Sequence, residues 1–519
     1  MKIRAYRVLL LAAGLAAGAG ACTDVTTEPV STVTGSNVFD DPGSYRAFLA
    51  KLYGGLSVTG QQGPAGSGDV GGIDEGFSQY LRQLWQLQEL PTDEAIIAWG
   101  DAGLPELNTQ QWGASNQFIS ALYYRLYFQI ALANEFMRET SDARLSQRNT
   151  GADLRGQIKQ FRAEARFLRA LSYFHGMDLY GNIPLVTEES RNGVAPPPQA
   201  TRQQIYDYVV SELTAIRGDL PAIGEAEYGR ADRGAVEMLL AKVYLNAQVY
   251  TGTARFAEAR AAAEAVINSN AYQLDTNYLR IFSADNHTSP EMIFPVPFDG
   301  LNTRTYGGTT FLIHASVGGD LKAENYGIDG GWWGLRLRPE AFRFYASGDQ
   351  RSSYFVMQET VENTSISDYK KGVAAPKYRN VTSTGRPGSN LTFPDTDFPL
   401  FRLADAHLMY AEAVLRGGGG SRAQALQYVN ALRTRASAGN ITDAQLTLDF
   451  ILAERGRELL WEGHRRMDLI RFGRFTDQGV WSWKGGTLAG RTTAAHLNLY
   501  PIPASELAAN PNLKQNPGY

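Results

Sequence analysis

The stretch DRGAVEMLLAKVYLNAQVYTGTARFAEARAAAEAVIN, residues 232–268, decides the fold class that we expect for this chain. It predicts a helix over residues 232–247, a short turn at Thr251-Gly252 and a second helix over residues 255–268. Alanine recurs along both helices, at Ala235, Ala241, Ala247, Ala257, Ala261 and Ala265. Because small side chains let two helices approach closely, the pattern is typical of a tetratricopeptide-like hairpin.

A second stretch has the same character. It predicts helices over residues 403–415 and 423–436, joined by a glycine-rich turn at residues 416–420. No strict 34-residue repeat is present, so the hairpins are expected to be degenerate. Helical periodicity also predicts a helix that begins near Asp41-Pro42. Further helices are predicted over residues 80–90, 114–138, 154–180, 201–220, 444–455 and 458–472.

Residues 283–400 differ from the rest of the chain. They are rich in Gly, Pro, Asn, Thr and aromatic residues, and no helix is expected there except near residues 339–345. A stretch of this length without regular elements is uncommon in a compact domain unless it is functional. The predicted fold class is therefore mainly α, with tetratricopeptide-like helix pairs (an α/α superhelix) that carry an irregular, aromatic-rich loop lobe with minor β.

The amino terminus predicts export from the cytoplasm. Three basic residues, Lys2, Arg4 and Arg7, precede an apolar run over residues 8–19 that is too short for a membrane span, so residues 1–21 are expected to be a signal peptide. Cys22, the only cysteine, follows directly and is expected to carry lipid, with residues 22–38 as a tether; the alternative is ordinary cleavage that leaves Cys22 unmodified.

The composition excludes several classes of protein. The formal net charge is −4 over 519 residues, so no basic field exists to attract nucleic acid. The six histidines do not form a zinc pattern, and neither a P-loop nor a nucleophile elbow is present, so no metal, cofactor or catalytic residue is predicted.

Six motifs in order resemble signatures of the SusD/RagB family of outer-membrane nutrient-binding lipoproteins. They are LQELPTDEAIIAW (87–99), EARFLRALSYFHGMDLYGNIPLV (164–186), SPEMIFPV (289–296), RLADAHLMYAEAVLR (402–416), ERGRELLWEGHRRMDLIRFGRF (454–475) and YPIPASELAANPNLKQNPGY (500–519). The resemblance divides the chain into an N-terminal helical region (39–282), a ligand-binding lobe (283–400) and a C-terminal helical region (401–519).

The resemblance also implies a role. Proteins of this family are lids over TonB-dependent outer-membrane barrels of the SusC type, bind oligosaccharides or, in some members, peptides, and deliver them into the barrel. It implies a binding protein rather than an enzyme. Some members carry Ca²⁺ in the lobe, but the sequence does not predict that ion here.

Aromatic residues in loops are the best candidates for ligand contact, because a sugar offers apolar ring faces together with many hydroxyls. The candidate ligand-binding residues are Trp99, Asn302, Arg304, Tyr306, Trp332 and Trp333. The alternative is that the tryptophans form a small core of the lobe. Exposure of Tyr306 and Trp332 would favour nutrient capture, and their full burial would favour a scaffold that binds only protein.

Charged motifs admit both a structural and a functional interpretation. The adjacent pair Asp93-Glu94 could serve a secreted glycosidase, but adjacent side chains diverge, so we expect Asp93 to cap a helix that begins at Ala95. The charges over residues 454–471 predict a partly buried ion network rather than a phosphate or acidic-substrate site. We interpret the stripe Arg162, Arg166 and Arg169 in the same way.

Overall fold

The structure is a computed structural model that describes residues 38–190 and 195–519. The contacts divide the chain into two units, residues 1–45 and 46–519. Of the first unit, a short turn at Val38–Asp40 and the first residues of helix α2 (Gly43–Ser57) are described. The expected signal peptide, Cys22 and residues 22–37 of the tether lie outside the described residues. The second unit contains both the helix pairs and the lobe.

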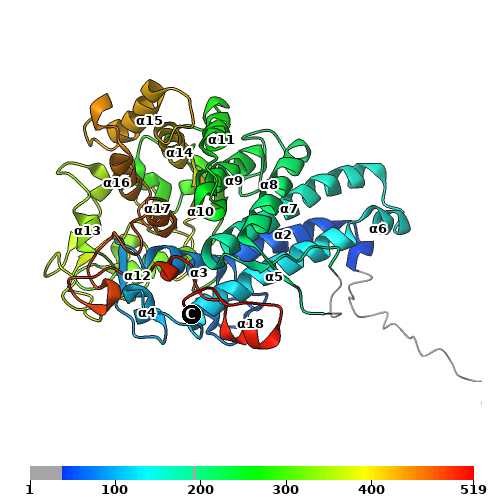
Figure 1. The fold of residues 1–519 in the computed structure, drawn as a ribbon, viewed down its shortest axis with the longest axis horizontal. Coiled ribbons are helices and arrows are strands. Elements are labelled where there is room, and N and C mark those ends of the chain that lie inside the picture. Colours follow the sequence, from blue (N-terminus) through cyan, green and yellow to red (C-terminus); the bar gives the residue numbers. More distant parts are fainter. Residues whose placement is uncertain (1–37, 191–194) are drawn as a thin grey trace, which may run out of the picture. The chain divides into compact units, whose positions relative to one another are not determined.

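Helices dominate this unit, which confirms the expected fold class (Figure 1). The N-terminal helices are α3 (Tyr80–Glu89), α4 (Leu104–Thr109), α5 (Gln117–Glu139), α6 (Asp142–Gln147), α7 (Ala152–Tyr180), α8 (Arg202–Ile216), α9 (Arg233–Leu245), α10 (Ala247–Thr251) and α11 (Phe256–Asn268). The C-terminal helices are α14 (Leu403–Leu415), α15 (Arg422–Arg435), α16 (Leu448–Glu458), α17 (Arg465–Arg471) and α18 (Ala504–Ala509). None of the helices within the described ranges is both long and apolar enough to cross a bilayer.

The long helices form one continuous array. In order, α5 packs on α7, α7 on α8, α8 on α9, α9 on α11, α11 on α14 and α14 on both α15 and α16. Figure 1 shows the green α11 beside the orange-brown α14, although the whole lobe separates them in sequence. The lobe is therefore an insertion that leaves the array of hairpins unbroken.

Local sequence explains how the hairpins close. The Asp232 side chain caps α9 by accepting a hydrogen bond from the Ala235 backbone N–H at 3.0 Å. Ala259 and Ala263 of α11 are fully buried, so the helix approaches its neighbours closely. The turn between α14 and α15 is equally tight, because a Cβ added at Gly418 would lie 2.5 Å from the Phe256 carbonyl oxygen. Of the alanines that predicted the first hairpin, Ala235, Ala241 and Ala247 are buried, whereas Ala257, Ala261 and Ala265 are exposed, so other alanines of α11 make its close contacts.

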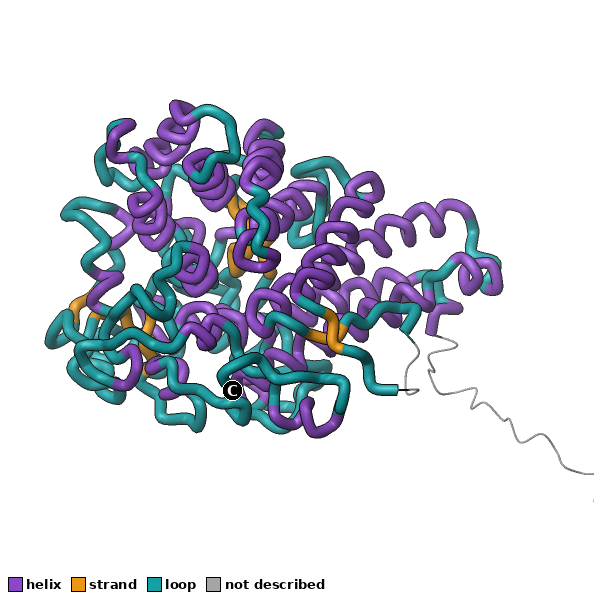
Figure 2. The backbone as a smooth tube through the Cα atoms, in the orientation of Figure 1, coloured by secondary structure: helices purple, strands orange, loops and turns teal. Residues whose placement is uncertain are grey.

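The lobe holds most of the strands, which are short (Figure 2). The strands of this unit are β1 (Ala95–Ile97), β2 (Ile183–Pro184), β3 (Gln199–Ala200), β4 (Met292–Val296), β5 (Leu335–Leu337), β6 (Val356–Met357), β7 (Val373–Ala374) and β8 (Phe398–Arg402). Strands β4 and β8 pair antiparallel and close the base of the lobe, and β1 joins a four-stranded sheet in the order β1-β5-β7-β6. The N-terminal region thus contributes an edge strand to the lobe.

The expectation that the lobe has no helix outside residues 339–345 was wrong. Helix α12 (Gly308–Ser316) lies in its interior, whereas α13 covers only Pro339–Phe342. Every residue of α12 is buried, so the segment has no polar face and no amphipathic period. Its β-branched and glycine residues also have low helix propensity. For both reasons the sequence gives no helical signal there.

The expected cap at Asp93 was also wrong. Residues Ala95–Ile97 form strand β1, and the Asp93 carboxylate instead accepts hydrogen bonds from Arg465 Nε and Nη2 at 2.7 and 2.8 Å. The helix expected over 458–472 begins only at Arg465, since Trp461 and Gly463 have φ values of +60° and +79°. These positive φ values end the helical path between α16 and α17.

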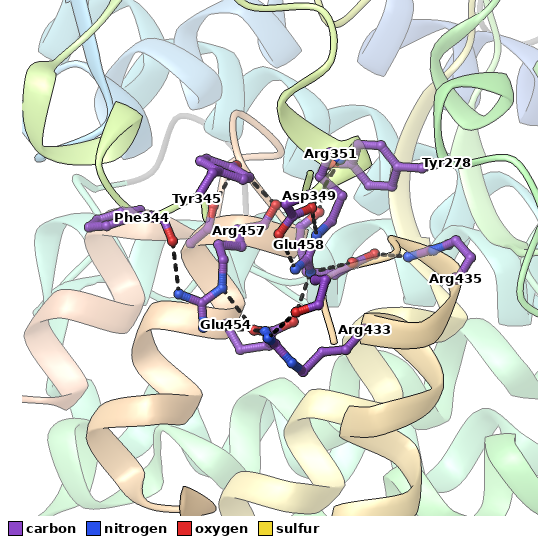
Figure 3. A network of polar contacts seen from close by, with 12 residues as sticks. Tyr278, Phe344, Tyr345, Asp349, Arg351, Arg433, Arg435, Glu454, Arg457 and Glu458 are labelled. Atoms are coloured by element: carbon purple, nitrogen blue, oxygen red, sulfur yellow. Dashed lines mark hydrogen bonds and ion pairs between the residues drawn. The ribbon is translucent and has the colours of Figure 1, made fainter. Parts of the chain in front are cut away.

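The expected ion network is confirmed, and it is buried (Figure 3). We define the buried ion cluster as Arg351, Arg402, Arg435, Lys377, Glu291, Glu454, Glu458 and Glu462. Arg402 bonds Glu291, Glu458 and Glu462 at 2.7, 2.8 and 2.6 Å, and Arg351 bonds Glu454 at 2.8 Å. Burial alone would raise the pKa of Glu458, but the surrounding arginines outweigh it and hold that pKa well below its usual range.

The arginine stripe on α7 is likewise paired. Arg166 and Arg169 both bond Glu212 of α8, at 2.8 and 2.9 Å. Arg162 donates to the Met137 carbonyl oxygen and to Thr140 Oγ1, both at 2.8 Å. The stripe therefore joins neighbouring helices of the array.

Substitution of Arg402 by Met should destabilise the protein by about 3–5 kcal/mol, because three buried carboxylates lose a shared partner. Urea denaturation measures the change. The matched control is Arg343→Met, whose ion pair with Glu362 leaves the two side chains 56% and 51% exposed. The control should lose less than about 1 kcal/mol. Equal losses in the two variants would contradict a stabilising role for the buried ion cluster.

Two buried carboxyls hold the loop between α16 and α17. Glu89 Oε1 accepts hydrogen bonds from the Gly463 and His464 backbone N–H groups at 2.7 and 3.1 Å, and Glu94 Oε2 accepts from the Trp461 N–H at 3.3 Å. Burial raises the pKa of both, that of Glu89 to about 8. The folded protein therefore retains protons that the unfolded chain releases near pH 4.5.

This difference predicts that stability falls as pH rises. Each of these carboxyls has a higher pKa in the folded protein than in the unfolded chain. Its contribution to the free energy of unfolding is therefore complete below the pKa of the unfolded chain and is lost as the pH rises through the pKa of the folded protein. Thermal unfolding between pH 5.5 and 8.5 should show wild type losing stability relative to Glu89→Gln, which copies the protonated form. Parallel curves for the two proteins would refute the assignment.

Candidate ligand-binding site

Strand pairing brings two distant aromatic residues together. Strand β1 pairs with β5 from Ala95↔Leu337 to Ile97↔Leu335, and the ladder ends with the Ala98 N–H donating to the Gly334 carbonyl oxygen at 2.9 Å. Trp99 Nε1 then donates to the Trp332 carbonyl oxygen at 3.1 Å. A Cβ at position 334 would lie 2.6 Å from the Trp99 ring, so a glycine is needed there. Trp99 is thereby fixed beside Trp332.

Three partly exposed rings lie in a row, and we call Trp99, Trp332 and Tyr306 the aromatic arc. The ring centroids of Trp99 and Trp332 are 6.2 Å apart and tilted by 46°. Those of Trp332 and Tyr306 are 6.3 Å apart and tilted by 49°. The three rings therefore lie at successive angles to one another.

A buried guanidinium, that of Arg82, contacts the arc. Arg82 of α3 lies 4.3 Å from the ring centroid of Phe311 of α12 and 5.7 Å from that of Trp99. Its Nη1 donates to the Tyr306 carbonyl oxygen at 3.1 Å. Burial lowers the pKa of Arg82 to about 9, partly offset by nearby carboxylates that include Asp101, so the group stays charged at neutral pH.

Two further side chains fix the arc from behind. His314 of α12 stacks on Trp332 with ring centroids 4.7 Å apart, and its ring nitrogens face the Gly330 and Thr392 carbonyl oxygens at 2.6 and 3.0 Å. Phe393 lies 5.3 Å from Tyr306 between ring centroids. These contacts leave the arc little freedom to rearrange when a ligand binds.

The structure brings together three of the six candidate residues. Trp333 is 48% exposed and packs on Tyr369, with ring centroids 6.0 Å apart, and no ring contact joins it to the described residues of the arc. Asn302 is exposed and donates to Asp299 Oδ2 at 2.7 Å. Arg304 is exposed and forms no ion pair with any described residue. The last two lie on the loop that leads into Tyr306.

The support of the arc escaped the sequence analysis. Arg82 belongs to a helix in which every residue is buried, and Phe311 and His314 belong to the helix that periodicity missed. The Trp332 and Tyr306 residues are partly exposed, which lies between the exposure expected for ligand capture and the full burial expected for a scaffold that binds only protein.

The charged residues offer no comparable site. Glu94 is 1% exposed and Asp93 is held by Arg465, so this pair does not form two free carboxylates in a cleft. Over residues 38–190 and 195–519, no group of three or more His, Cys, Asp or Glu side chains could hold a metal ion.

Comparisons of the sequence with known proteins match nearly the whole chain. A sequence model of the SusD family matches residues 285–519, and a model described as starch-binding and associating with the outer membrane matches residues 79–245. The starch-binding protein SusD of Bacteroides thetaiotaomicron is 35% identical, with 98% of each chain covered. SusD-like protein P2 of Formosa agariphila is 25% identical over 96% of this chain and 97% of its own.

Solved structures share the fold. A SusD superfamily protein from Parabacteroides distasonis matches with a TM-score of 0.73 and 23% identity, covering 94% of this chain and all of its own. Surface glycan-binding protein A from Bacteroides thetaiotaomicron, solved with laminarihexaose, matches with a TM-score of 0.70 and 20% identity, covering 91% and 99%. These two structures show that the chain shares their fold.

Proposed function

The chain belongs to the SusD family, and on that premise we propose that it is a surface-exposed outer-membrane lipoprotein that binds a glycan on the aromatic arc. It passes the glycan to a SusC-like TonB-dependent transporter. The observation that supports the binding role is the meeting of Trp99, Trp332 and Tyr306, which come from distant segments and are each partly exposed. The transporter and the site of action rest on family membership.

The chemistry of the arc suits a neutral glycan. Sugar rings have apolar faces that stack on aromatic rings, and their hydroxyls need polar partners at the edge. Asp101 is exposed and lies two residues after Trp99 in the sequence. It is close enough to Arg82 to raise the pKa of that guanidinium. Its carboxylate is therefore a candidate to accept a hydrogen bond from a sugar hydroxyl. The tilts of 46° and 49° between successive rings suit a curved chain better than a flat one.

A starch-type α-glucan is the ligand that we propose. The relative with 35% identity is a starch-binding protein, and its likeness extends over 98% of the chain. An α-1,4-glucan is helical, so its successive sugar faces turn, as the rings of the arc do. Peptide capture remains the alternative that the binding experiment also tests.

Wild-type protein should bind maltoheptaose, and Trp332→Ala should weaken that binding at least tenfold, or about 1.4 kcal/mol. The central ring of the arc is lost in this variant. Isothermal titration calorimetry measures both. The matched control is Met357→Ala, which removes a side chain 58% exposed on β6 and should leave affinity unchanged.

Two results would contradict this assignment. Unchanged affinity in Trp332→Ala would remove the arc from the binding site. Failure of wild type to bind any member of a glycan panel, with binding to peptides instead, would replace the proposed ligand class.

Membrane attachment is tested at Cys22. In cells that process lipoproteins, wild type should incorporate labelled palmitate and partition into detergent, because several acyl chains bury many methylenes. Cys22→Ser should do neither and should appear in the soluble fraction. A wild-type protein without an acyl group would remove the anchor from the proposal and leave glycan binding untouched.

A further inference from the structure

An exposed tyrosine outside the arc stands between two hollows. Tyr228, in the loop between α8 and α9, is 45% exposed. It lines a hollow of 310 Å³ together with Arg46, Tyr53 and Glu227, and a second hollow of 390 Å³ together with His287, Asp299 and Asp395. Pro297 also borders both hollows. Volumes of this size are typical of small-molecule sites.

The Tyr228 ring is held in place without any ligand. Its hydroxyl donates to Asp397 Oδ2 at 2.6 Å, and Asp397 Oδ1 accepts from the Phe298 N–H at 2.8 Å. The Asn286 side chain bonds both the N–H and the carbonyl oxygen of Asp397, at 3.1 and 2.8 Å. Burial and the Asp397 carboxylate raise the pKa of Tyr228, so its hydroxyl keeps the proton that it donates.

The next residue fixes the backbone as well. Gly229 has a φ of +80°, and a Cβ there would lie 2.6 Å from Pro297 Cγ. Only glycine tolerates both conditions. A ring that is anchored at its hydroxyl and at its backbone loses little entropy when a ligand stacks on it.

The walls around Tyr228 carry groups that hydrogen-bond hydroxyls. In the larger hollow, Asp299 and Asp395 accept hydrogen bonds from loop N–H groups, at 2.7 Å from Leu301 and 2.9 Å from Gly300. Oδ1 of each residue already accepts two hydrogen bonds. Oδ2 accepts only one, from Asn302 Nδ2 in Asp299 and from the Ser389 N–H in Asp395, so it keeps a lone pair for a ligand. The hydrogen bond from Asn302 lowers the pKa of Asp299, so this side chain is ionised at neutral pH and accepts only.

The smaller hollow supplies the complementary groups. Tyr53 is anchored like Tyr228, since its hydroxyl donates to Glu164 Oε2 at 2.6 Å. Arg46 and Glu227 form an ion pair at 2.8 Å on the rim, with side chains 65% and 57% exposed. This side therefore offers apolar ring surface together with exposed donors and acceptors.

The two hollows share their loops with the arc. Gly300 lies against residues 389–393, because a Cβ there would be 2.2 Å from the Phe393 carbonyl oxygen. Phe393 in turn packs on Tyr306 of the arc, with ring centroids 5.3 Å apart. Leu301, which lines the larger hollow, is 60% exposed. The larger hollow and the Tyr306 end of the arc thus share one pair of loops, residues 297–306 and 389–397.

We propose that Tyr228 is the centre of a second glycan-binding site, separate from the aromatic arc, which takes neutral sugar residues on its ring and their hydroxyls on Asp299, Asp395 and His287. The carboxylates disfavour an anionic ligand at this position. The ligand class rests on the proposed function, whereas the location rests on the hollows and the anchored ring. A long glycan that reaches both sites gains affinity through effective concentration.

The test isolates the second site in the Trp332→Ala background, in which the arc is impaired. Saturation-transfer NMR with maltoheptaose should give a residual signal for Trp332→Ala that disappears in the Trp332→Ala, Tyr228→Ala double variant. In the wild-type background, Tyr228→Ala should weaken binding to amylopectin in affinity gels about 3–10-fold. Its affinity for maltotriose should change by less than about twofold, because a short ligand occupies only the arc.

Two further variants keep the test informative if Tyr228→Ala folds poorly. Tyr228→Phe retains the ring and should keep most of the residual signal. His287→Ala changes an exposed side chain of the larger hollow and should reduce the signal without affecting thermal unfolding.

The outcomes separate the two proposals. If wild type binds maltoheptaose and Trp332→Ala gives no residual signal, the second site is overturned and the function of the arc stands. A residual signal of equal strength in the double variant would come from the impaired arc or from another surface, and would overturn the assignment to Tyr228. If wild type binds no glycan at all, the proposed function itself fails.

Discussion

The pairing of buried arginines with carboxylates on and after α16 is the interaction on which the rest of the structure depends. Glu458 and Glu462 meet Arg402 at the start of α14, Lys377 and Arg351 come from the lobe, and Glu291 comes from the segment before β4. Glu89 and Glu94, from the N-terminal region, bind the loop that follows α16. A charge buried without a partner costs several kcal/mol, so these segments are confined to arrangements in which every charge is paired. The cluster therefore determines how the inserted lobe is seated on the helical array.

The sequence predicted those parts of the fold that depend on neighbours along the chain. Helix α14 begins and ends at the expected residues, and α9 and α11 differ from expectation by only one or two residues, because alanine contacts and caps are local signals. The failures have long-range causes. Strand β1 exists because Ala95 pairs with Leu337, and α17 begins late because buried carboxylates bind the backbone of residues 461–464. No pattern of neighbouring residues carries that information.

The same division applies to the site. Glycine-flanked aromatics in loops indicated Trp332 and Tyr306, and Trp99 followed from its place behind the first motif. Whether Trp332 or Trp333 belongs to the arc, however, depends on the backbone conformation at residue 333. Trp333 has a φ of +55°, which turns it toward Tyr369, while Trp332 stacks on His314. The sequence does not distinguish the two adjacent tryptophans, and only the fold gives them different surroundings. Tyr228 was missed for a related reason, since its anchor Asp397 is 169 residues away.

The rigid mounting of the rings has a physical logic. A capture protein must bind strongly enough to retain a ligand and weakly enough to release it. Aromatic stacking contributes modest energy per ring, on the order of 1 kcal/mol, with little dependence on exact registry. Affinity then grows with the number of rings that a chain covers, whereas each ring can be vacated separately. Arg82, His314 and Asp397 keep the rings in place from behind, so the ordering of the protein is completed during folding rather than at binding. Contact with several rings, each of which adds a little binding energy, favours long glycans over single sugars. This preference follows from the spacing of the rings and requires no movement of the helical array.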